Sequence, residues 1–377
     1  MQTKSLLVKG LAVGIILLFI GTSVIPSNAQ YIEKPSLPAS RSHWLFVGGY
    51  GPGNYSKIQD AINHASDGDT VFVFSGLYYE NLIVDKRINI IGEDRNSAII
   101  DGSRSTNDVI TIVSSNVLIK GFTIRNSLDY SWGISSDCNT VSIDDNIIEH
   151  NSGAIKIRNC QDTNISRNVI RGNHHQAIEL NNASNSTIYR NTITQHYDPR
   201  FGGGISLFSN SNYNTVVYNI VGDNHNGIVC VNCNYNKIHA NKITYCQYSA
   251  IYLSNASNNE INSNILSSLA YGIDVSFHSE YNNISMNNIS SGRIYYGIFI
   301  DDSSFNKIYH NNFLQKTEGA HFFNCIWNNW NENFWYKTRS FPKPIFGVVY
   351  INFTLGIPWI NFDWHPAQEP YDIPGMR

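Results

Sequence analysis

The feature that most constrains this chain is an asparagine that recurs every 22 to 28 residues in one apolar context. An aliphatic residue stands three positions before each asparagine, and an apolar residue stands two positions after it. A second phrase, Gly or Ala followed by Ile, keeps the same period. The recurring asparagines are Asn146, Asn168, Asn191, Asn219, Asn241, Asn264, Asn287 and Asn311, with Phe122 at the equivalent position of an earlier copy.

A period in the low twenties indicates stacked coils. The apolar residues are two apart and mostly β-branched, which is typical of strands, and no apolar run keeps helical spacing long enough to cross a coil. Each coil would bury its apolar residues against the next, at about 4.8 Å per strand step. The sequence therefore predicts an all-β chain, a single-stranded parallel β-helix of about ten coils.

Two physical roles are expected for the recurring asparagine. The strand must bend between its inward positions, and Asn tolerates the left-handed backbone that a tight bend needs. Its amide can also bond to the asparagines of the coils above and below, which satisfies buried polar groups along the stack.

The N-terminal segment predicts export. An apolar run at residues 6–20 follows Lys4 and is interrupted only by Lys9, so residues 1–29 are predicted to be a secretory signal peptide, with a retained anchor as the alternative. Its removal changes the formal net charge from −3 to −5, which argues against nucleic acid as a partner. We expect a monomer that is secreted, extracellular or in the cell envelope or periplasm, with no membrane span after signal removal.

The rest of the chain divides into three parts. Residues 30–42 are a linker, residues 43–313 the β-helix with its N-terminal cap, and residues 314–377 an irregular cap that lays aromatic rings over the last coil. A platform for sugar rings is the alternative for the last part. A capping box at residues 56–59 is predicted to open an amphipathic helix that runs to about Ala65 and covers the first strand.

The six cysteines leave one alternative open. Cys138 and Cys160 fall one coil apart in a column of small residues, where either a disulfide or a stack of buried thiols is expected. Cys230 and Cys233 form a C-x-x-C pair, but no second pair follows at zinc-finger spacing. A zinc ribbon is therefore not predicted.

The residues that follow the linker carry a family resemblance. The succession YSKIQDAINHASDGDTVFVFSGLYYENLIVDKRINIIGED resembles the opening of the secreted right-handed β-helix proteins grouped with NosD copper-site accessory proteins and with the domain of carbohydrate-binding proteins and sugar hydrolases. The downstream phrase N-x-x-S-x-N-x-I is similar to the parallel β-helix repeat of that superfamily. The likeness covers residues 44–315 and implies a right-handed, pectate-lyase-like β-helix. Because members include enzymes and binding proteins, it leaves the chemistry open and transfers no metal-ligand set.

The longest loop between the two phrases, residues 195–203, points to a functional face. Insertions on one side of a solenoid often mark such a face. We predict a glycan-binding groove beside it, with His196, Tyr197 and Tyr252 as carbohydrate-binding residues.

Two other activities fit the same region. A polysaccharide lyase or glycoside hydrolase needs a base, a cation or paired carboxyl groups, and the candidates are Lys156, Glu179, Asp198 and Arg200. A NosD-like accessory protein would bind copper or zinc through stacked imidazoles about 5 to 10 Å apart. The candidate metal ligands are His174, His175, His196 and His225.

Sequons agree with the predicted export. Eight N-x-S/T sites fit a glycoprotein surface, although some must arise by chance in so Asn-rich a chain. They are Asn54, Asn164, Asn182, Asn185, Asn255, Asn283, Asn288 and Asn352.

Overall fold

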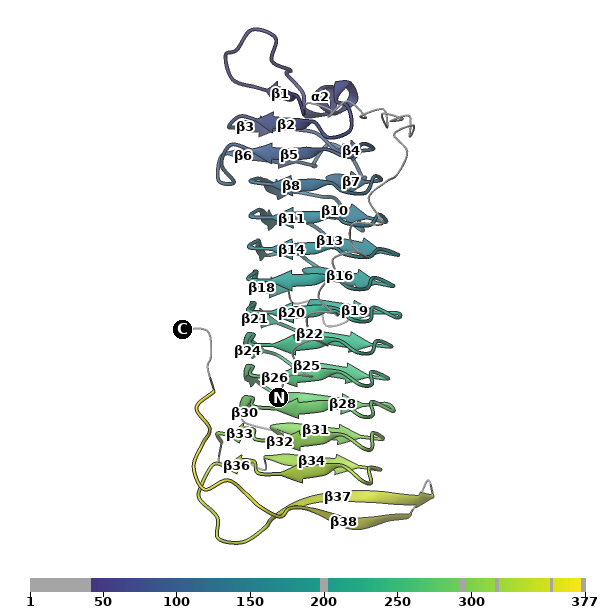
Figure 1. The fold of residues 1–377 in the computed structure, drawn as a ribbon, viewed down its shortest axis with the longest axis vertical. Coiled ribbons are helices and arrows are strands. Elements are labelled where there is room, and N and C mark those ends of the chain that lie inside the picture. The colour runs from purple at the N-terminus through teal and green to yellow at the C-terminus, as the bar shows by residue number, and fades with distance from the viewer. Residues whose placement is uncertain (1–41, 197–202, 292–295, 316–318, 353–354, 374–377) are drawn as a thin grey trace, which may run out of the picture. The chain divides into compact units, whose positions relative to one another are not determined.

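The computed structural model describes residues 42–196, 203–291, 296–315, 319–352 and 355–373. From Ser42 onward the chain winds into about 13 stacked turns (Figure 1). The predicted parallel β-helix is therefore confirmed, but about ten coils were expected. The additional turns lie toward the ends, where irregular or aromatic residues replace the recurring phrase.

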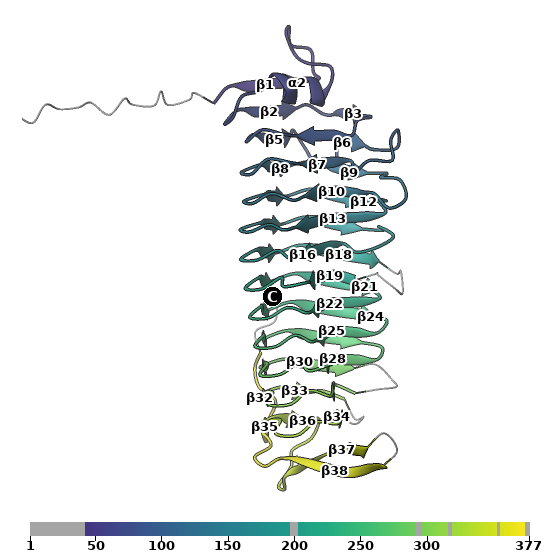
Figure 2. The same ribbon diagram turned by 90° about the vertical axis from the view of Figure 1, so that its right-hand side faces the viewer.

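Three columns of strands run along the stack, and Figure 2 shows them from the side. Column A contains the Gly/Ala-Ile phrase, and its strands pair in parallel from coil to coil. Its strands are β4 (Leu82–Val84), β7 (Ile110–Ile112), β10 (Trp132–Ser136), β13 (Gly153–Arg158), β16 (Ile178–Asn181), β19 (Gly203–Phe208), β22 (Asn226–Val231), β25 (Ser249–Ser254), β28 (Tyr271–Ser276), β31 (Ile298–Asp301), β34 (Ala320–Phe323) and β37 (Lys343–Asn352).

Column B follows column A in each coil and begins with the strand at the start of the described chain. Its strands are β1 (Trp44–Val47), β2 (Thr70–Val73), β5 (Asn89–Gly92), β8 (Leu118–Lys120), β11 (Ser142–Asp144), β14 (Asn164–Ser166), β17 (Thr187–Tyr189), β20 (Thr215–Val217), β23 (Lys237–His239), β26 (Glu260–Asn262), β29 (Asn283–Ser285), β32 (Lys307–Tyr309), β35 (Asn329–Asn331) and β38 (Leu355–Asp363).

Column C completes each coil as a separate 12-stranded sheet. Its strands are β3 (Gly76–Tyr78), β6 (Ala98–Asp101), β9 (Thr123–Arg125), β12 (Ile147–Glu149), β15 (Val169–Arg171), β18 (Thr192–His196), β21 (Ile220–Asn224), β24 (Lys242–Cys246), β27 (Ile265–Ser268), β30 (Asn288–Ser291), β33 (Asn312–Phe313) and β36 (Phe334–Trp335). We refer below to the A–B corner, the B–C bend and the C–A loops between the columns.

The core is a stack of aliphatic side chains, because each strand turns its alternate residues inward. The isoleucine of the Gly/Ala-Ile phrase in column A stacks on its equivalent in the next coil and is fully buried. These residues are Ile134, Ile155, Ile178, Ile205, Ile228, Ile251, Ile273 and Ile298.

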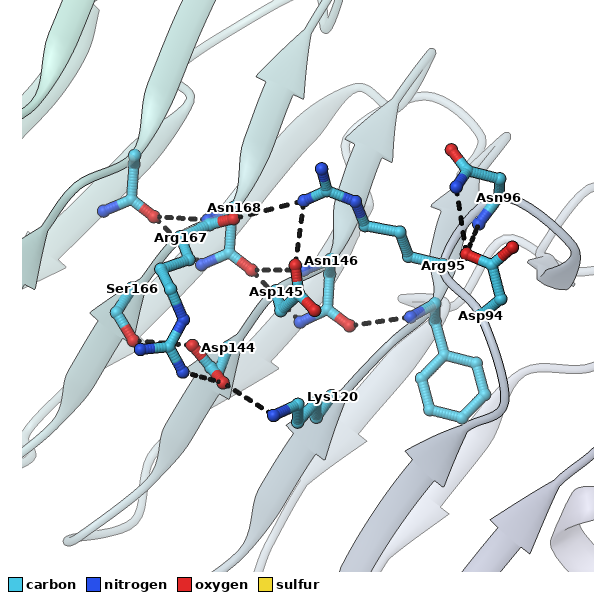
Figure 3. Close-up of polar contacts among 12 residues, drawn as sticks. Asp94, Arg95, Asn96, Lys120, Asp144, Asp145, Asn146, Ser166, Arg167 and Asn168 are labelled. Carbon is cyan, nitrogen blue, oxygen red and sulfur yellow. Dashed lines mark hydrogen bonds and ion pairs between the residues drawn. The ribbon is translucent and has the colours of Figure 1, made fainter.

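The recurring asparagines form a continuous buried ladder at the B–C bend. Figure 3 shows its first asparagines: Nδ2 of Asn146 donates to Oδ1 of Asn168 at 3.1 Å, and the same oxygen accepts the backbone N–H of Asn146 at 2.9 Å. The ladder begins with the backbone N–H of Phe122, which donates to Asn146. It extends past Asn311 to Asn333, so the coils continue beyond the expected end at Phe313.

The predicted left-handed backbone belongs to a neighbouring residue. The residue before each ladder asparagine has φ near +55°, as at Asp145, Arg167 and Arg190. The asparagines are not among the positive-φ residues, so their contribution to the bend is the hydrogen bonding of the amide.

Two further ladders are formed by residues that the repeat analysis did not align. The A–B corner holds Asn214, Asn236, Asn259, Asn282, Asn306 and Asn328, whose amides bond from coil to coil. A shorter ladder, with Asn151 and Asn173, lies at the C–A loops. Both could have been found by the same counting, because each corner asparagine stands five positions before a bend asparagine.

The N-terminal helix α2 (Ile58–His64) lies where it was expected, but its predicted capping box does not form. Lys57 is the N-cap residue and makes no side-chain cap hydrogen bond. The Glu80 carboxylate instead accepts the backbone N–H groups of Ile58 (2.8 Å) and Gln59 (3.0 Å). A carboxylate from a distant segment therefore takes the role that sequence rules give to a local side chain.

The aromatic residues predicted at the C-terminal end include rings that are buried and stacked. Trp335 stacks on Phe313 with ring centroids 4.1 Å apart, and both rings are buried. The antiparallel hairpin β37–β38 follows the last coil (Figure 1). The six cysteines are free thiols, so the stack of thiols, and not the disulfide, is the arrangement at Cys138 and Cys160.

Candidate functional site

The outward side chains of column A form one continuous track, which we call the column A face. Strand pairing aligns them from coil to coil. The track consists of Ser135, Lys156, Glu179, Ser206, Val229, Tyr252, Asp274, Phe299 and His321. Two groups of polar and aromatic residues stand out on it.

The first group, the charged cluster, brings together two of the predicted catalytic residues. Nζ of Lys156 lies 3.8 Å from Oε1 of Glu179 and 5.0 Å from the centroid of the Trp132 ring. Gly153 makes this possible, because a Cβ atom there would meet the Trp132 ring at 2.5 Å. The Asp108 carboxylate fixes the start of the cluster by accepting the backbone N–H of Trp132 at 2.6 Å.

The insertion at residues 195–203 contains three other predicted residues. Tyr197, Asp198 and Arg200 fall in residues 197–202, which lie outside the described part of the chain. That segment connects β18 to β19, the strand that contributes Ser206 next to Glu179.

The second group, the acidic–aromatic cluster, contains Tyr252, Asp274, Ser276, Phe299 and Asp301. Asp274 is only 3% exposed although it belongs to the outward track. Oγ of Ser276 donates to its Oδ1 at 2.6 Å. Strand pairing places Tyr252 on one side of Asp274 and Phe299 on the other.

Burial controls the protonation of this cluster. Loss of solvent raises the pKa of Asp274 to about 6, and the hydrogen bond from Ser276 lowers it without reversing the shift. Burial also raises the pKa of Asp301, with a further contribution from Asp302. A carboxyl group that titrates close to neutral pH beside a second carboxyl is typical of functional sites.

Further rings border the acidic–aromatic cluster. Tyr271 stacks on Phe299 at 5.1 Å, Tyr296 stacks on His321 at 4.7 Å, and Phe323 meets the edge of Phe299 at 5.7 Å. This part of the column A face therefore combines two carboxyl groups with a wide aromatic surface.

The column B face differs around Asp144, because the charged residues there pair with one another. Figure 3 shows the Asp144 carboxylate between Lys120 and Arg167, while Ser166 donates to it at 2.9 Å. Nearby, Arg95 pairs with Asp145 at 2.9 Å. Asp144 is 5% exposed, and both of its carboxylate oxygens are engaged by its three partners.

The predicted metal ligands do not converge. His174 and His175 adjoin, with Nδ1 atoms 3.4 Å apart, and the ring of His225 stacks on Tyr248. Within the described ranges, no group of three or more His, Cys, Asp or Glu is placed to hold a metal ion. The described residues therefore do not fit the predicted copper or zinc site.

His196 lies in the interior of the coil. It is fully buried in register with Asn173 and Asn224, and its backbone N–H donates to Oδ1 of Asn224 at 3.0 Å. Burial lowers its pKa to about 4, so the imidazole is neutral at physiological pH. It is therefore not available to a carbohydrate or a metal at the surface.

Asp274 was not among the site residues predicted from the sequence. The signal that could have found it was available, because Asp274 stands between two aromatic positions of the outward track, Tyr252 and Phe299. What the sequence could not reveal is the burial that makes this aspartate unusual.

Two family models match parts of the chain. Residues 86–232 match the right handed beta helix region, and residues 201–351 match NosD, described as a periplasmic copper-binding protein. The chain is a right-handed parallel β-helix protein. The predicted resemblance to NosD and to pectate-lyase-like β-helix proteins is thereby confirmed. No curated protein matches this β-helix protein by sequence.

Solved structures give the same fold. The A-module of the mannuronan C-5 epimerase AlgE6 from Azotobacter vinelandii is 14% identical, with a TM-score of 0.65 over 73% of this chain and 87% of that chain. A DFA-IIIase from Arthrobacter chlorophenolicus A6, solved in complex with GF2, is also 14% identical, with a TM-score of 0.59 over 79% and 95% of the two chains. XylC, solved with xylose, is 12% identical, with a TM-score of 0.56 over 85% and 89%. At these identities the likeness concerns the fold alone.

No helix of the described residues is long and apolar enough to cross a membrane. The apolar run at residues 6–20 lies outside the described part.

Proposed function

We propose that this β-helix protein binds a glycan along the column A face. The observation that carries the proposal is the acidic–aromatic cluster, in which two carboxyl groups lie among Tyr252, Tyr271 and Phe299. Aromatic rings offer apolar surface for the C–H faces of sugars, and carboxyl oxygens accept hydrogen bonds from their hydroxyl groups. Two proteins of the same fold support the proposal: AlgE6 is a mannuronan C-5 epimerase, and XylC was solved with xylose.

The charged cluster would extend the same binding face. Lys156 is engaged by Glu179 and Trp132, so its ammonium group is held in place to donate hydrogen bonds to sugar oxygens. We assign it a binding role in preference to the predicted role of a catalytic base.

The proposal includes a location outside the cytoplasm. The predicted signal peptide and the periplasmic description of the NosD family support it. A glycan of the envelope or of the surroundings would be accessible there.

The test is a binding screen with defined polysaccharides, followed by calorimetry on two variants, Tyr252→Ala and Phe299→Ala. We expect each to weaken binding about tenfold, because each removes one ring from the face. The control is Tyr309→Ala, which removes a ring from column B in the coil that holds Phe299. Unchanged affinity in both face variants, or an equal loss in the control, would refute the proposal.

A second candidate function, glycan cleavage, is favoured by one observation: the raised pKa of Asp274, about 6. A carboxyl group that keeps its proton near this pH can donate it to a glycosidic oxygen, while a second carboxylate activates water. Chromatography of the same mixtures would detect released fragments. Release that stops in Asp274→Asn while binding persists would support cleavage, and the absence of fragments would leave a binding protein only.

A further inference from the structure

A second surface, distinct from the column A face, carries exposed rings at the A–B corner. The residue before each corner-ladder asparagine points into solvent, and so does Asn185, which precedes Ser186 at the equivalent position of the coil before Asn214. We call this series the corner stripe. It consists of Asn185, Tyr213, Tyr235, Asn258, Tyr281, Phe305 and Trp327.

Neither the backbone nor the core explains the rings of the corner stripe. All seven residues have φ between 54° and 62°, a left-handed conformation that Asn adopts readily and bulky residues rarely do. The five aromatic side chains are also 41% to 73% exposed. Asparagine serves at two positions of the same stripe, so aromatic residues at the other five require another reason.

The rings stack on one another along the axis. Tyr213 and Tyr235 lie 5.1 Å apart with planes at 5°, and Tyr281 and Phe305 lie 5.3 Å apart with planes at 8°. These separations match the coil step of about 4.8 Å. Each ring therefore occupies one coil.

One coil in the middle of the stripe has no ring. The ladder bonds from Asn236 to Asn259 and from Asn259 to Asn282 show that Tyr235, Asn258 and Tyr281 belong to consecutive coils. Tyr235 and Tyr281 are thus two coil steps apart, about 10 Å. The short Asn258 side chain leaves the position of one ring open between them.

We propose that a pyranose ring of a glycan binds between Tyr235 and Tyr281, above the amide of Asn258. The ring would continue the stack with one apolar face against each tyrosine, while the amide bonds to a hydroxyl group. The corner residues of these three coils, 231–236, 254–259 and 276–282, include four Asn besides the ladder members and no Lys or Arg. This amide-rich surface carries one acid, Glu280, and no Lys or Arg, so it suits sugar hydroxyls and does not suit nucleotide phosphates.

The site goes beyond the proposed function, because it uses a different corner of the coil. Binding at the corner stripe and binding at the column A face can therefore succeed or fail separately.

The experiment uses saturation-transfer NMR and titration with cellohexaose and chitohexaose on the full chain. All variants carry Tyr252→Ala and Phe299→Ala, so that binding at the column A face does not contribute to the measured affinity. In this background we expect Asn258→Tyr to lower affinity at least about tenfold, because a protein ring then fills the open position, and Tyr281→Ala to lower it about fivefold. Tyrosine already occupies this backbone conformation in the neighbouring coils, so Asn258→Tyr should fold.

The matched control is Asn185→Tyr. It adds the same ring at the same stripe position, beside Tyr213, but fills no position between two rings, so binding should be unchanged. Absence of binding by either hexasaccharide, or equal affinity with and without Asn258→Tyr, would overturn the proposal. If the unsubstituted protein, with its column A face intact, still binds a glycan when the corner site does not, only the proposal for the corner site is refuted.

Discussion

At the scale of the residue, a ladder asparagine stabilises two coils at once. Oδ1 of Asn241 accepts the backbone N–H and the Nδ2 group of Asn219 at 2.9 and 3.0 Å, and its own Nδ2 donates to the backbone oxygen of Val216 at 2.9 Å and to Oδ1 of Asn264 at 3.1 Å. The side chain is 1% exposed, so water cannot replace these partners.

Asn241→Ala is therefore expected to lower the free energy of unfolding by about 3 kcal/mol, since two buried donors of Asn219 lose their acceptor. Urea unfolding measures this change. The control, Asn262→Ala, removes an amide of the next coil whose Nδ2 bonds only to the Glu260 side chain, and should cost about 0.5 kcal/mol or less. Equal effects would show that the ladder does not carry the stability assigned to it.

His196 makes stability depend on pH. Its pKa is about 4 in the folded state and near 6.5 when unfolded, so the unfolded chain binds more protons between these values. The stability contributed by the neutral ring is present above pH 6.5 and is lost as the pH falls through 4, with a total of about 3 kcal/mol.

The variant His196→Asn tests this, because asparagine is the residue of that ladder at Asn173 and Asn224. Relative to the variant, the parent chain should lose about 3 kcal/mol between pH 7 and pH 4, measured by urea unfolding at both values. Parallel pH profiles for the two proteins would contradict the account.

At the scale of the element, the last coil is closed by a single carboxylate. Asp363 of β38 is fully buried and accepts the backbone N–H groups of Glu332 (3.0 Å) and Asn333 (2.9 Å), and Nε1 of Trp335 at 2.9 Å. It occupies the place that the next ladder asparagine would take, and it ends the ladder with an acceptor.

We expect Asp363→Ala to loosen β35 and β36 without unfolding the earlier coils, because contacts in a solenoid connect mainly neighbouring coils. Loss of a charged acceptor with several donors should cost about 3 kcal/mol locally, which makes amide exchange there roughly a hundredfold faster. Hydrogen exchange with mass spectrometry measures this, with Asp372→Ala, an exposed residue of the same segment, as the control. Unchanged exchange in β35 and β36 would refute the role of Asp363.

The strands of column A and the cap of α2 show which elements sequence rules can predict. The strands of column A were predictable because Gly133, Ala154 and Ala177 repeat a local pattern that each coil satisfies against the next. The cap of α2 was not, because Glu80 belongs to a separate segment. Rules based on local sequence assign caps to nearby side chains and cannot identify a distant carboxylate.

At the scale of the whole molecule, repetition made the fold and the outward track predictable, but it could not identify a site. Lys156 and Glu179 were selected for their charge and do lie together. Asp274 was passed over, although burial makes it the more unusual acid, and His196 was selected although it faces the interior. Burial depends on the side chains of neighbouring coils, which counting along one chain does not give.

Glycan binding to the column A face can be tested directly by a crystal structure of the protein with the oligosaccharide that binds most tightly in the screen. We expect sugar rings against Tyr252 and Phe299, with a hydroxyl group hydrogen-bonded to Asp274. A bound oligosaccharide that leaves this face empty and lies only on the C-terminal hairpin would contradict it.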